Sequence, residues 1–224
     1  MQMSSREHDQ TCIDSKPNDE DKSSGREYRA TVVIAVPSWL CSTLASDAMD
    51  GQGALPVWIL PMVPGRRIAG WVCTASITEN DNLGLRQAIA GGPIDGTVLV
   101  AIGSPTGTRA IIGDILATWM LARGFEALVT DGLVRDSAQL RQMDLGIWCR
   151  GVTPVASTRK GPGTVGISVR CGEVNVSPGD LLVADDDGVV VSPAHVPALL
   201  RLAEQRLHRD EAMKEQIRRG LAPD

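Results

Sequence analysis

The sequence has no excess of positive charge and very few aromatic side chains. Lys and Arg number 22 against 27 Asp and Glu, a formal net charge of −5, and the 224 residues include five Trp, one Tyr and one Phe. Surfaces that bind nucleic acids concentrate Lys and Arg on one face and often add aromatic side chains. The sequence shows no such stripe, and we therefore expect no nucleic-acid partner.

Cysteine pairs and long apolar runs are also missing. The five cysteines are scattered, without a CxxC pair or a neighbouring His cluster, which argues against a zinc site and a disulfide framework. No apolar run approaches the roughly 20 residues that span a bilayer, and the N-terminus lacks the apolar core of a signal peptide. We therefore expect free thiols in a cytoplasmic protein that does not enter a membrane.

Two glycine-rich loops lack the context of a nucleotide site. Residues 103–107 (GSPTG) are not followed by the Gly-Lys-Ser/Thr of a P-loop. Residues 161–166 (GPGTVG) fit GxGxxG, but the next residues, 167–170, alternate like a strand, whereas a dinucleotide fingerprint opens a helix. Neither loop predicts a nucleotide.

The chain divides into a polar tail and one domain. Residues 1–29 are polar, mixed in charge and nearly free of large aliphatic side chains, so they cannot bury enough surface to offset the entropy of ordering. We expect a disordered tail over residues 1–29 and a single domain with a C-terminal helix over residues 30–224. The hydrophobic content of 43% is enough for a core.

Strand-like and helix-like runs alternate along this domain. Short apolar runs predict strands at 57–60, 68–74, 97–102 and 127–130, and a hairpin at 181–191. Helices are predicted at 38–49, with Ser38 as the cap, at 80–90 before a Gly-Gly pair, and after Ser192. The alternation is typical of an α/β domain.

Residues 113–136 (GDILATWMLARGFEALVTDGLVRD) carry the most informative pattern. Gly113 and Asp114 open a helical run, and Arg135 and Asp136 follow the strand at 127–130 and a tight turn. A helix N-terminus offers free backbone N–H groups to an anion, and the other end offers a guanidinium beside a carboxylate. Ligands of parallel α/β sheets bind just beyond strand ends. A small carboxylate substrate and a metal ion would together need this set.

Structural roles for the same residues remain open at this point. Asp114 could simply favour the helix dipole as a first-turn acid. Asp136, followed three residues later by Gln139, resembles a capping box. Arg135 could be a surface cation.

Several ordered motifs resemble a known family. They are the run at 113–136, IWCRGVTP at 147–154 and VSPGDLLVADDDGVVVSP at 176–193, with weaker matches at 42–56 and 64–76. Together they cover roughly residues 38–200 and are similar to the RraA-like family. This family includes the regulator of ribonuclease E activity A and the class II pyruvate aldolases of 4-hydroxy-4-methyl-2-oxoglutarate and 4-carboxy-4-hydroxy-2-oxoadipate.

The resemblance implies a fold, an assembly and a site. The fold would be an α/β domain of the three-layer β/β/α swivelling type, assembled as homotrimers or hexamers with active sites near subunit boundaries. Arg135 would hold the substrate, and Asp136 would bind a divalent metal, Mg²⁺ or Mn²⁺. The backbone amides that would bind the pyruvyl portion belong to Gly113, Asp114, Ile115 and Leu116.

The implied activity is a metal-dependent lyase reaction. Cleavage of a 4-hydroxy-2-oxo acid to pyruvate and decarboxylation of oxaloacetate both pass through the pyruvate enolate, which a Lewis-acidic metal and paired hydrogen bonds from Arg135 would stabilise. The chain departs from the family at Gln139, where an acid is usual, and so has one negative charge fewer near the metal. The alternative is a non-catalytic regulator that binds a ribonuclease or another protein.

Overall fold

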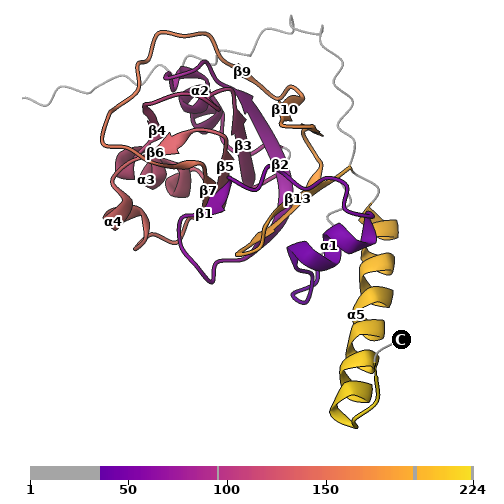
Figure 1. The fold of residues 1–224 in the computed structure, drawn as a ribbon. Helices are drawn as coiled ribbons and strands as arrows, with labels where there is room; N and C mark the ends of the chain where they lie inside the picture. Colours follow the sequence, from indigo (N-terminus) through magenta and orange to yellow (C-terminus); the bar gives the residue numbers. More distant parts are fainter. Residues whose placement is uncertain (1–35, 95, 194–195, 223–224) are drawn as a thin grey trace, which may run out of the picture. The chain divides into compact units, whose positions relative to one another are not determined.

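The computed structural model describes residues 36–94, 96–193 and 196–222 (Figure 1). The tail predicted for residues 1–29 lies outside the described residues.

The centre of this domain is a mixed sheet with the strand order β1-β7-β5-β3-β2-β12-β13 and with β9 paired to β2. Strands β2, β3, β5 and β7 run parallel to one another, whereas β12 and β13 form an antiparallel hairpin beside β2. The strands are β1 (Leu60–Pro61), β2 (Ile68–Ser76), β3 (Val98–Ile102), β5 (Ala127–Thr130), β7 (Gly146–Cys149), β9 (Thr164–Val165), β12 (Leu181–Asp185) and β13 (Gly188–Ser192).

Both faces of this sheet are covered, which explains why its strands read as continuous apolar runs. In β3, Leu99 and Ala101 point into one hydrophobic cluster, and Val98 and Val100 point into another. The first cluster lies under helices α2 (Leu83–Gly91), α3 (Asp114–Ala122) and α4 (Ser137–Leu140). The second includes side chains of the hairpin formed by β10 (Val169–Cys171) and β11 (Val174–Val176). The α/β class and the three-layer β/β/α arrangement are confirmed (Figure 1).

A second, smaller sheet was not predicted. It consists of three short parallel strands, β4 (Ala110–Ile112), β6 (Leu133–Val134) and β8 (Gly151–Val152). Strand β4 leads directly into α3, and β6 leads into Arg135. This small sheet therefore positions both ends of the informative stretch.

The first helix begins later than predicted. Ser38 does not cap it, because α1 (Ser42–Ala48) starts after Cys41, which makes no side-chain cap. Instead the Ser42 N–H donates to Asp185 Oδ2 at 2.8 Å, and the Ser42 hydroxyl also bonds to this carboxylate. A carboxylate from the distant β12–β13 turn thus replaces the local cap.

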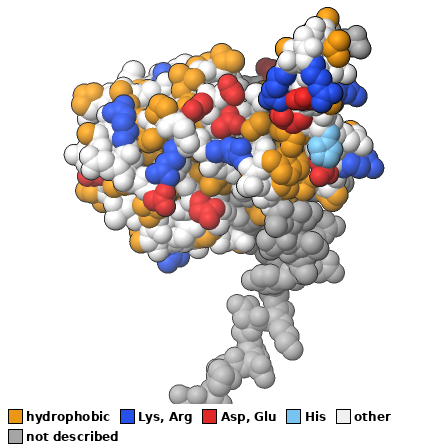
Figure 2. All heavy atoms as spheres, turned by 90° about the horizontal axis from the view of Figure 1, so that it is seen from below, with side chains coloured by type: hydrophobic (Ala, Val, Ile, Leu, Met, Phe, Trp, Pro, Cys, Tyr) orange, Lys and Arg blue, Asp and Glu red, His pale blue; other side chains and the backbone are white. Residues whose placement is uncertain are grey.

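The C-terminal helix α5 (Val196–Arg218) packs along α1, with Leu199 and Ala203 buried. Arg206 Nε lies 3.3 Å from Asp47 of α1. On the face shown in Figure 2, Lys and Arg side chains are interspersed with Asp and Glu. Among the helices in the described ranges, none combines the length and the apolar character needed to cross a bilayer.

Candidate functional site

Two neighbouring strand ends create the site. Strands β4 and β6 are parallel, so the residues that follow them, Gly113 and Arg135, emerge at the same edge. The Arg135 N–H donates to the Ile112 carbonyl at 3.0 Å, which extends the pairing one residue past β6. The start of α3 and the Arg135–Asp136 pair are therefore side by side, although they lie more than 20 residues apart in the chain.

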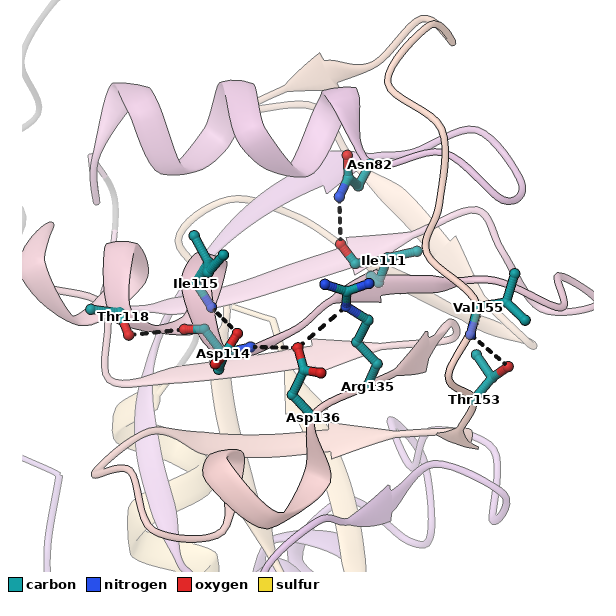
Figure 3. Close-up of polar contacts among 9 residues, drawn as sticks. All are labelled: Asn82, Ile111, Asp114, Ile115, Thr118, Arg135, Asp136, Thr153 and Val155. Atoms are coloured by element: carbon teal, nitrogen blue, oxygen red, sulfur yellow. Dashed lines mark hydrogen bonds and ion pairs between the residues drawn. The ribbon is translucent and has the colours of Figure 1, made fainter.

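Asp136 occupies a cap position, but its side chain does not cap its own helix. Its backbone carbonyl accepts hydrogen bonds from the first turn of α4, whereas its carboxylate makes no cap bond there, so the capping-box interpretation is wrong. Instead Asp136 Oδ2 lies 3.2 Å from Arg135 Nε and accepts a hydrogen bond from the Asp114 N–H at 3.3 Å (Figure 3). Asp136 also has a φ of +57°, a left-handed conformation that costs a non-glycine residue about 1 kcal/mol or more. Strain of this kind is typical of functional positions.

The N-terminus of α3 is occupied rather than free. The Asp114 N–H donates to Asp136, and the Ile115 N–H donates to Asp114 Oδ1 at 2.7 Å. The prediction of free N–H groups is therefore wrong for these two amides. They do bind carboxylate oxygens, however, and a ligand anion would have to replace these side chains.

Position 113 requires glycine because the side chains of Asp136 and Arg135 approach its backbone closely. A Cβ atom at this position would collide with Asp136 Oδ2 and would lie 2.9 Å from Arg135 Cγ. The backbone φ of −141° is open to any residue, so the constraint is steric.

These residues line a pocket of about 100 Å³. This volume is below the range of about 300–1,000 Å³ typical of sites for drug-sized ligands, and it suits a small molecule. All six predicted site residues line it: Gly113, Asp114, Ile115, Leu116, Arg135 and Asp136. Their catalytic and binding roles stay predictions.

The opposite wall comes from residues that the sequence did not single out. Asn82 and Arg86 reach the pocket from the start of α2, and Ser157 and Arg159 reach it from the loop after β8. Asn82 is buried; its Nδ2 donates to the Ile111 carbonyl at 3.0 Å, and its Oδ1 accepts from Arg86 Nε at 3.3 Å. Figure 3 shows Arg135 extending toward this side of the pocket. These residues lie far from 113–136 in sequence. The loop after β8 comes close to the pocket because Ala156 forms a parallel β-bridge with Ala110 of β4.

Asp81 fastens that loop to α2. Its carboxylate accepts hydrogen bonds from Leu83 N–H (2.8 Å), Thr158 Oγ1 (2.5 Å) and Lys160 N–H (2.6 Å). Burial raises the pKa of Asp81, but the hydrogen bonds from Thr158, Leu83, Lys160 and Gly161 outweigh it and lower the pKa to about 2. Asp81 is therefore ionised at neutral pH and holds the segment that carries Arg159.

The wall formed by α2 and the loop after β8 is electropositive, and some of its polar groups lack partners. Burial and the nearby positive charge of Arg159 both lower the pKa of Arg86. Within the described residues, neither Arg86 nor Arg159 forms an ion pair with a carboxylate. The buried Ser157 Oγ likewise has no hydrogen-bond partner in the part of the chain that the structure describes.

The donor set fits a hydrated divalent cation. Asp136, with a side chain 31% exposed, and Asp114 place carboxylates on the same pocket. No group of three or more His, Cys, Asp or Glu side chains suited to a metal occurs among the described residues. Mg²⁺ commonly binds through one or two carboxylates and keeps several waters, so this set suits Mg²⁺ better than ions that need a full protein cage. Gln139 is exposed and does not line the pocket.

The chain is similar to known proteins of one family. The model of the RraA-like family, described as Aldolase/RraA, matches residues 42–191. A protein of Halalkalibacterium halodurans named "Putative 4-hydroxy-4-methyl-2-oxoglutarate aldolase" is 34% identical over 178 residues, 79% of this chain and 84% of that protein. A protein of Halorhodospira halophila with the same name is 36% identical over 68% of this chain and 94% of its own length. The RNA-processing inhibitor RraA from Thermus thermophilis superposes with a TM-score of 0.62 at 30% identity, over 69% of this chain and 93% of that one.

Proposed function

Since this chain belongs to the RraA-like, or Aldolase/RraA, family, we propose that it is a divalent-metal-dependent lyase. Its substrate would be a 4-hydroxy-2-oxo acid such as 4-hydroxy-4-methyl-2-oxoglutarate, cleaved to pyruvate. The observation that carries the proposal is the convergence of the Asp136 carboxylate, the Arg135 guanidinium and the start of α3 on one small pocket.

The chain's own groups would bind the 2-oxo acid end of the substrate. Arg135 can hold the C1 carboxylate by paired hydrogen bonds, because its guanidinium presents a planar fork of donors. The amides at the start of α3 already bind carboxylate oxygens, so they suit the same anion. Asp136 must leave the Asp114 N–H before a substrate can use it, which makes Asp136 available to Mg²⁺ or Mn²⁺. When bound, the metal would polarise the 2-oxo group as a Lewis acid.

Bond cleavage follows from stabilising an enolate. The 4-hydroxyl loses its proton, the C3–C4 bond breaks, and its electron pair moves to C3 and the 2-oxo oxygen. The 4-hydroxyl carbon becomes the carbonyl of the second product, and a proton added at C3 completes pyruvate. Oxaloacetate would give the same enolate by loss of CO₂, so we expect decarboxylase activity as well.

We also propose that the site lies at the edge of a homotrimer or hexamer. Ile115 at the pocket is 73% exposed and Val155 on the facing loop is 45% exposed. Large apolar side chains beside a polar pocket are suited to cover by a neighbouring subunit. Light scattering after size-exclusion chromatography tests the assembly.

Release of pyruvate, measured with lactate dehydrogenase, tests the activity. Wild type, Asp136→Ala and Asp187→Asn would be compared on 4-hydroxy-4-methyl-2-oxoglutarate and oxaloacetate, with Mg²⁺ and with a chelator. Asp187 is an exposed carboxylate in the β12–β13 turn and controls for the loss of a charge. We expect metal-dependent turnover that is lost in Asp136→Ala and kept in Asp187→Asn. Folded wild-type protein that cleaves neither acid would overturn the proposal.

A second candidate is a non-catalytic regulator that binds another protein. The similarity to the RNA-processing inhibitor RraA and the exposed Gln139 at a usually acidic position favour it. Capture of a purified ribonuclease by wild type and by Asp136→Ala alike, without turnover, would support this function.

A further inference from the structure

We propose that Arg86 and Arg159 are the specificity-determining residues of the site, which form an anion subsite for the second carboxylate of a 2-oxo diacid such as 4-hydroxy-4-methyl-2-oxoglutarate. The inference rests on the proposed function for the orientation of the acid, because Arg135 and α3 would hold the 2-oxo end. The far end then faces the wall made by α2 and the loop after β8.

Arg86 and Arg159 line the same pocket as Arg135. The pocket is lined by α2 on one side and by the start of α3 on the other, and Arg159 joins it from the loop. A small pocket with three arginines on its walls suits a ligand with more than one negative charge. A monocarboxylate would engage Arg135 and leave the other two unmatched.

The two arginines are held without being neutralised. Asn82 fixes Arg86 through its Nε, and Asn82 is itself anchored to the Ile111 carbonyl. Within the described chain Nε is also the one nitrogen of Arg86 that has a hydrogen-bond partner, so its terminal nitrogens keep their donors for a ligand. Asp81 in turn ties the loop of Arg159 to the start of α2. Two like charges kept close together repel each other, and a carboxylate between them would remove that repulsion.

Ser157 gives an independent indication of a ligand. Its Oγ is buried on the pocket wall and lacks a hydrogen-bond partner among the described residues. Buried hydroxyl groups are nearly always satisfied, and rotation of this side chain about χ1 would let it donate to a ligand oxygen next to Arg159.

Binding of two uncleavable acids tests the subsite without turnover. 2-Oxoglutarate and 2-oxopentanoate share the 2-oxo acid end and chain length and differ in the distal carboxylate. Isothermal titration in the presence of Mg²⁺, in a buffer free of phosphate and sulfate, would compare full-length wild type, Arg86→Gln, Arg159→Gln and Arg67→Gln. Arg67 is exposed and outside the pocket, so Arg67→Gln removes the same charge elsewhere.

We expect wild type and Arg67→Gln to prefer 2-oxoglutarate by about 10- to 100-fold, the range for hydrogen bonds to a charged partner. Arg86→Gln and Arg159→Gln should each lose most of this preference while their affinity for 2-oxopentanoate stays unchanged. Equal binding of both acids by wild type, or an equal loss for both acids in the variants, would overturn the subsite.

The outcome separates the two proposals. Selective binding that depends on Arg86, by a protein that cleaves no 4-hydroxy-2-oxo acid, would support the subsite and refute the lyase activity. If the protein cleaved 4-hydroxy-4-methyl-2-oxoglutarate but bound 2-oxoglutarate and 2-oxopentanoate equally well, the lyase activity would be supported and the subsite refuted.

Discussion

Adding a single methyl group at Gly113 should lower the activity of the site much more than the stability of the fold. In Gly113→Ala the new Cβ would collide with Asp136 Oδ2 and lie 2.9 Å from Arg135 Cγ, whereas carbon atoms prefer about 3.5–4.0 Å. Both side chains must therefore move by roughly 0.6–1 Å. Displacements of this size at a catalytic centre can cost about 100-fold in rate.

Stability should change much less than activity. Overpacking a core costs about 1–3 kcal/mol, but the side chains of Arg135 and Asp136 are 37% and 31% exposed and can shift toward solvent. We expect a loss of about 1 kcal/mol in the free energy of unfolding, measured with urea. Pyruvate release should fall about 100-fold in kcat/KM.

Gly91→Ala is the matched control for this experiment. A Cβ at Gly91 meets nothing within 4 Å, and Gly91 has no positive φ. Activity of Gly91→Ala should equal that of wild type. If Gly113→Ala, folded and as stable as expected, kept wild-type kcat/KM, the assignment of the pocket to catalysis would be refuted.

Three further predictions concern the metal, the loop and the thiols. Asp136→Asn should weaken Mn²⁺ binding, followed by titration calorimetry, by more than the roughly 10- to 100-fold typical of outer-shell changes; unchanged affinity would place the metal elsewhere. Asp81→Asn should lower the free energy of unfolding by about 2 kcal/mol at pH 7, because the Asp81 pKa falls from 3.8 to about 2 on folding and each unit is worth about 1.4 kcal/mol. That contribution is complete above about pH 4 and is lost as the pH falls toward 2, so the gap between wild type and variant should close in acid; a gap constant with pH would contradict it. Burial raises the pKa of Cys149 to about 11 and that of Cys171 to about 12, so both should resist a thiol reagent at pH 8 while half-buried Cys41 reacts, as peptide mass spectrometry would show.

Buried strands and glycine-ended helices could be predicted from the sequence. The strand at 127–130 has the predicted bounds, because four apolar or β-branched residues between Gly124 and the Asp131–Gly132 turn leave little choice. Gly124, with a φ of +88° that suits glycine, follows the last residues of α3. Such elements are decided by residues next to one another in the chain, so they can be recognised in the sequence.

Features that depend on distant partners could not be predicted. Strand β6 has two residues, too few for any periodicity, and it exists because β4 and β8 flank it. Ser38 looked like a cap, but the carboxylate of Asp185 performs that task at Ser42. The cap position of Asp136 was predicted correctly, whereas the direction of its side chain depends on Gly113, which is 23 residues away.

For the same reason, the sequence predicted the residues of one wall of the pocket and not those of the other. Gly113, Asp114, Arg135 and Asp136 share one stretch with a recognisable pattern. Arg86 resembles an ordinary helix cation in sequence, and nothing in the run around Arg159 shows that it folds back onto β4. A cluster of arginines from separate segments becomes visible when the loop and helix are placed together.

The carboxylate of Asp81 fastens one wall of the pocket to α2, and the bridge between Ala156 and Ala110 joins that wall to the other. One wall is fixed by the ends of β4 and β6, and the other rests on a surface loop tied down at residues 158–160. Exchange of that loop between related chains, with Asp81 retained, should redirect which acids are accepted while the bond-breaking wall keeps its shape.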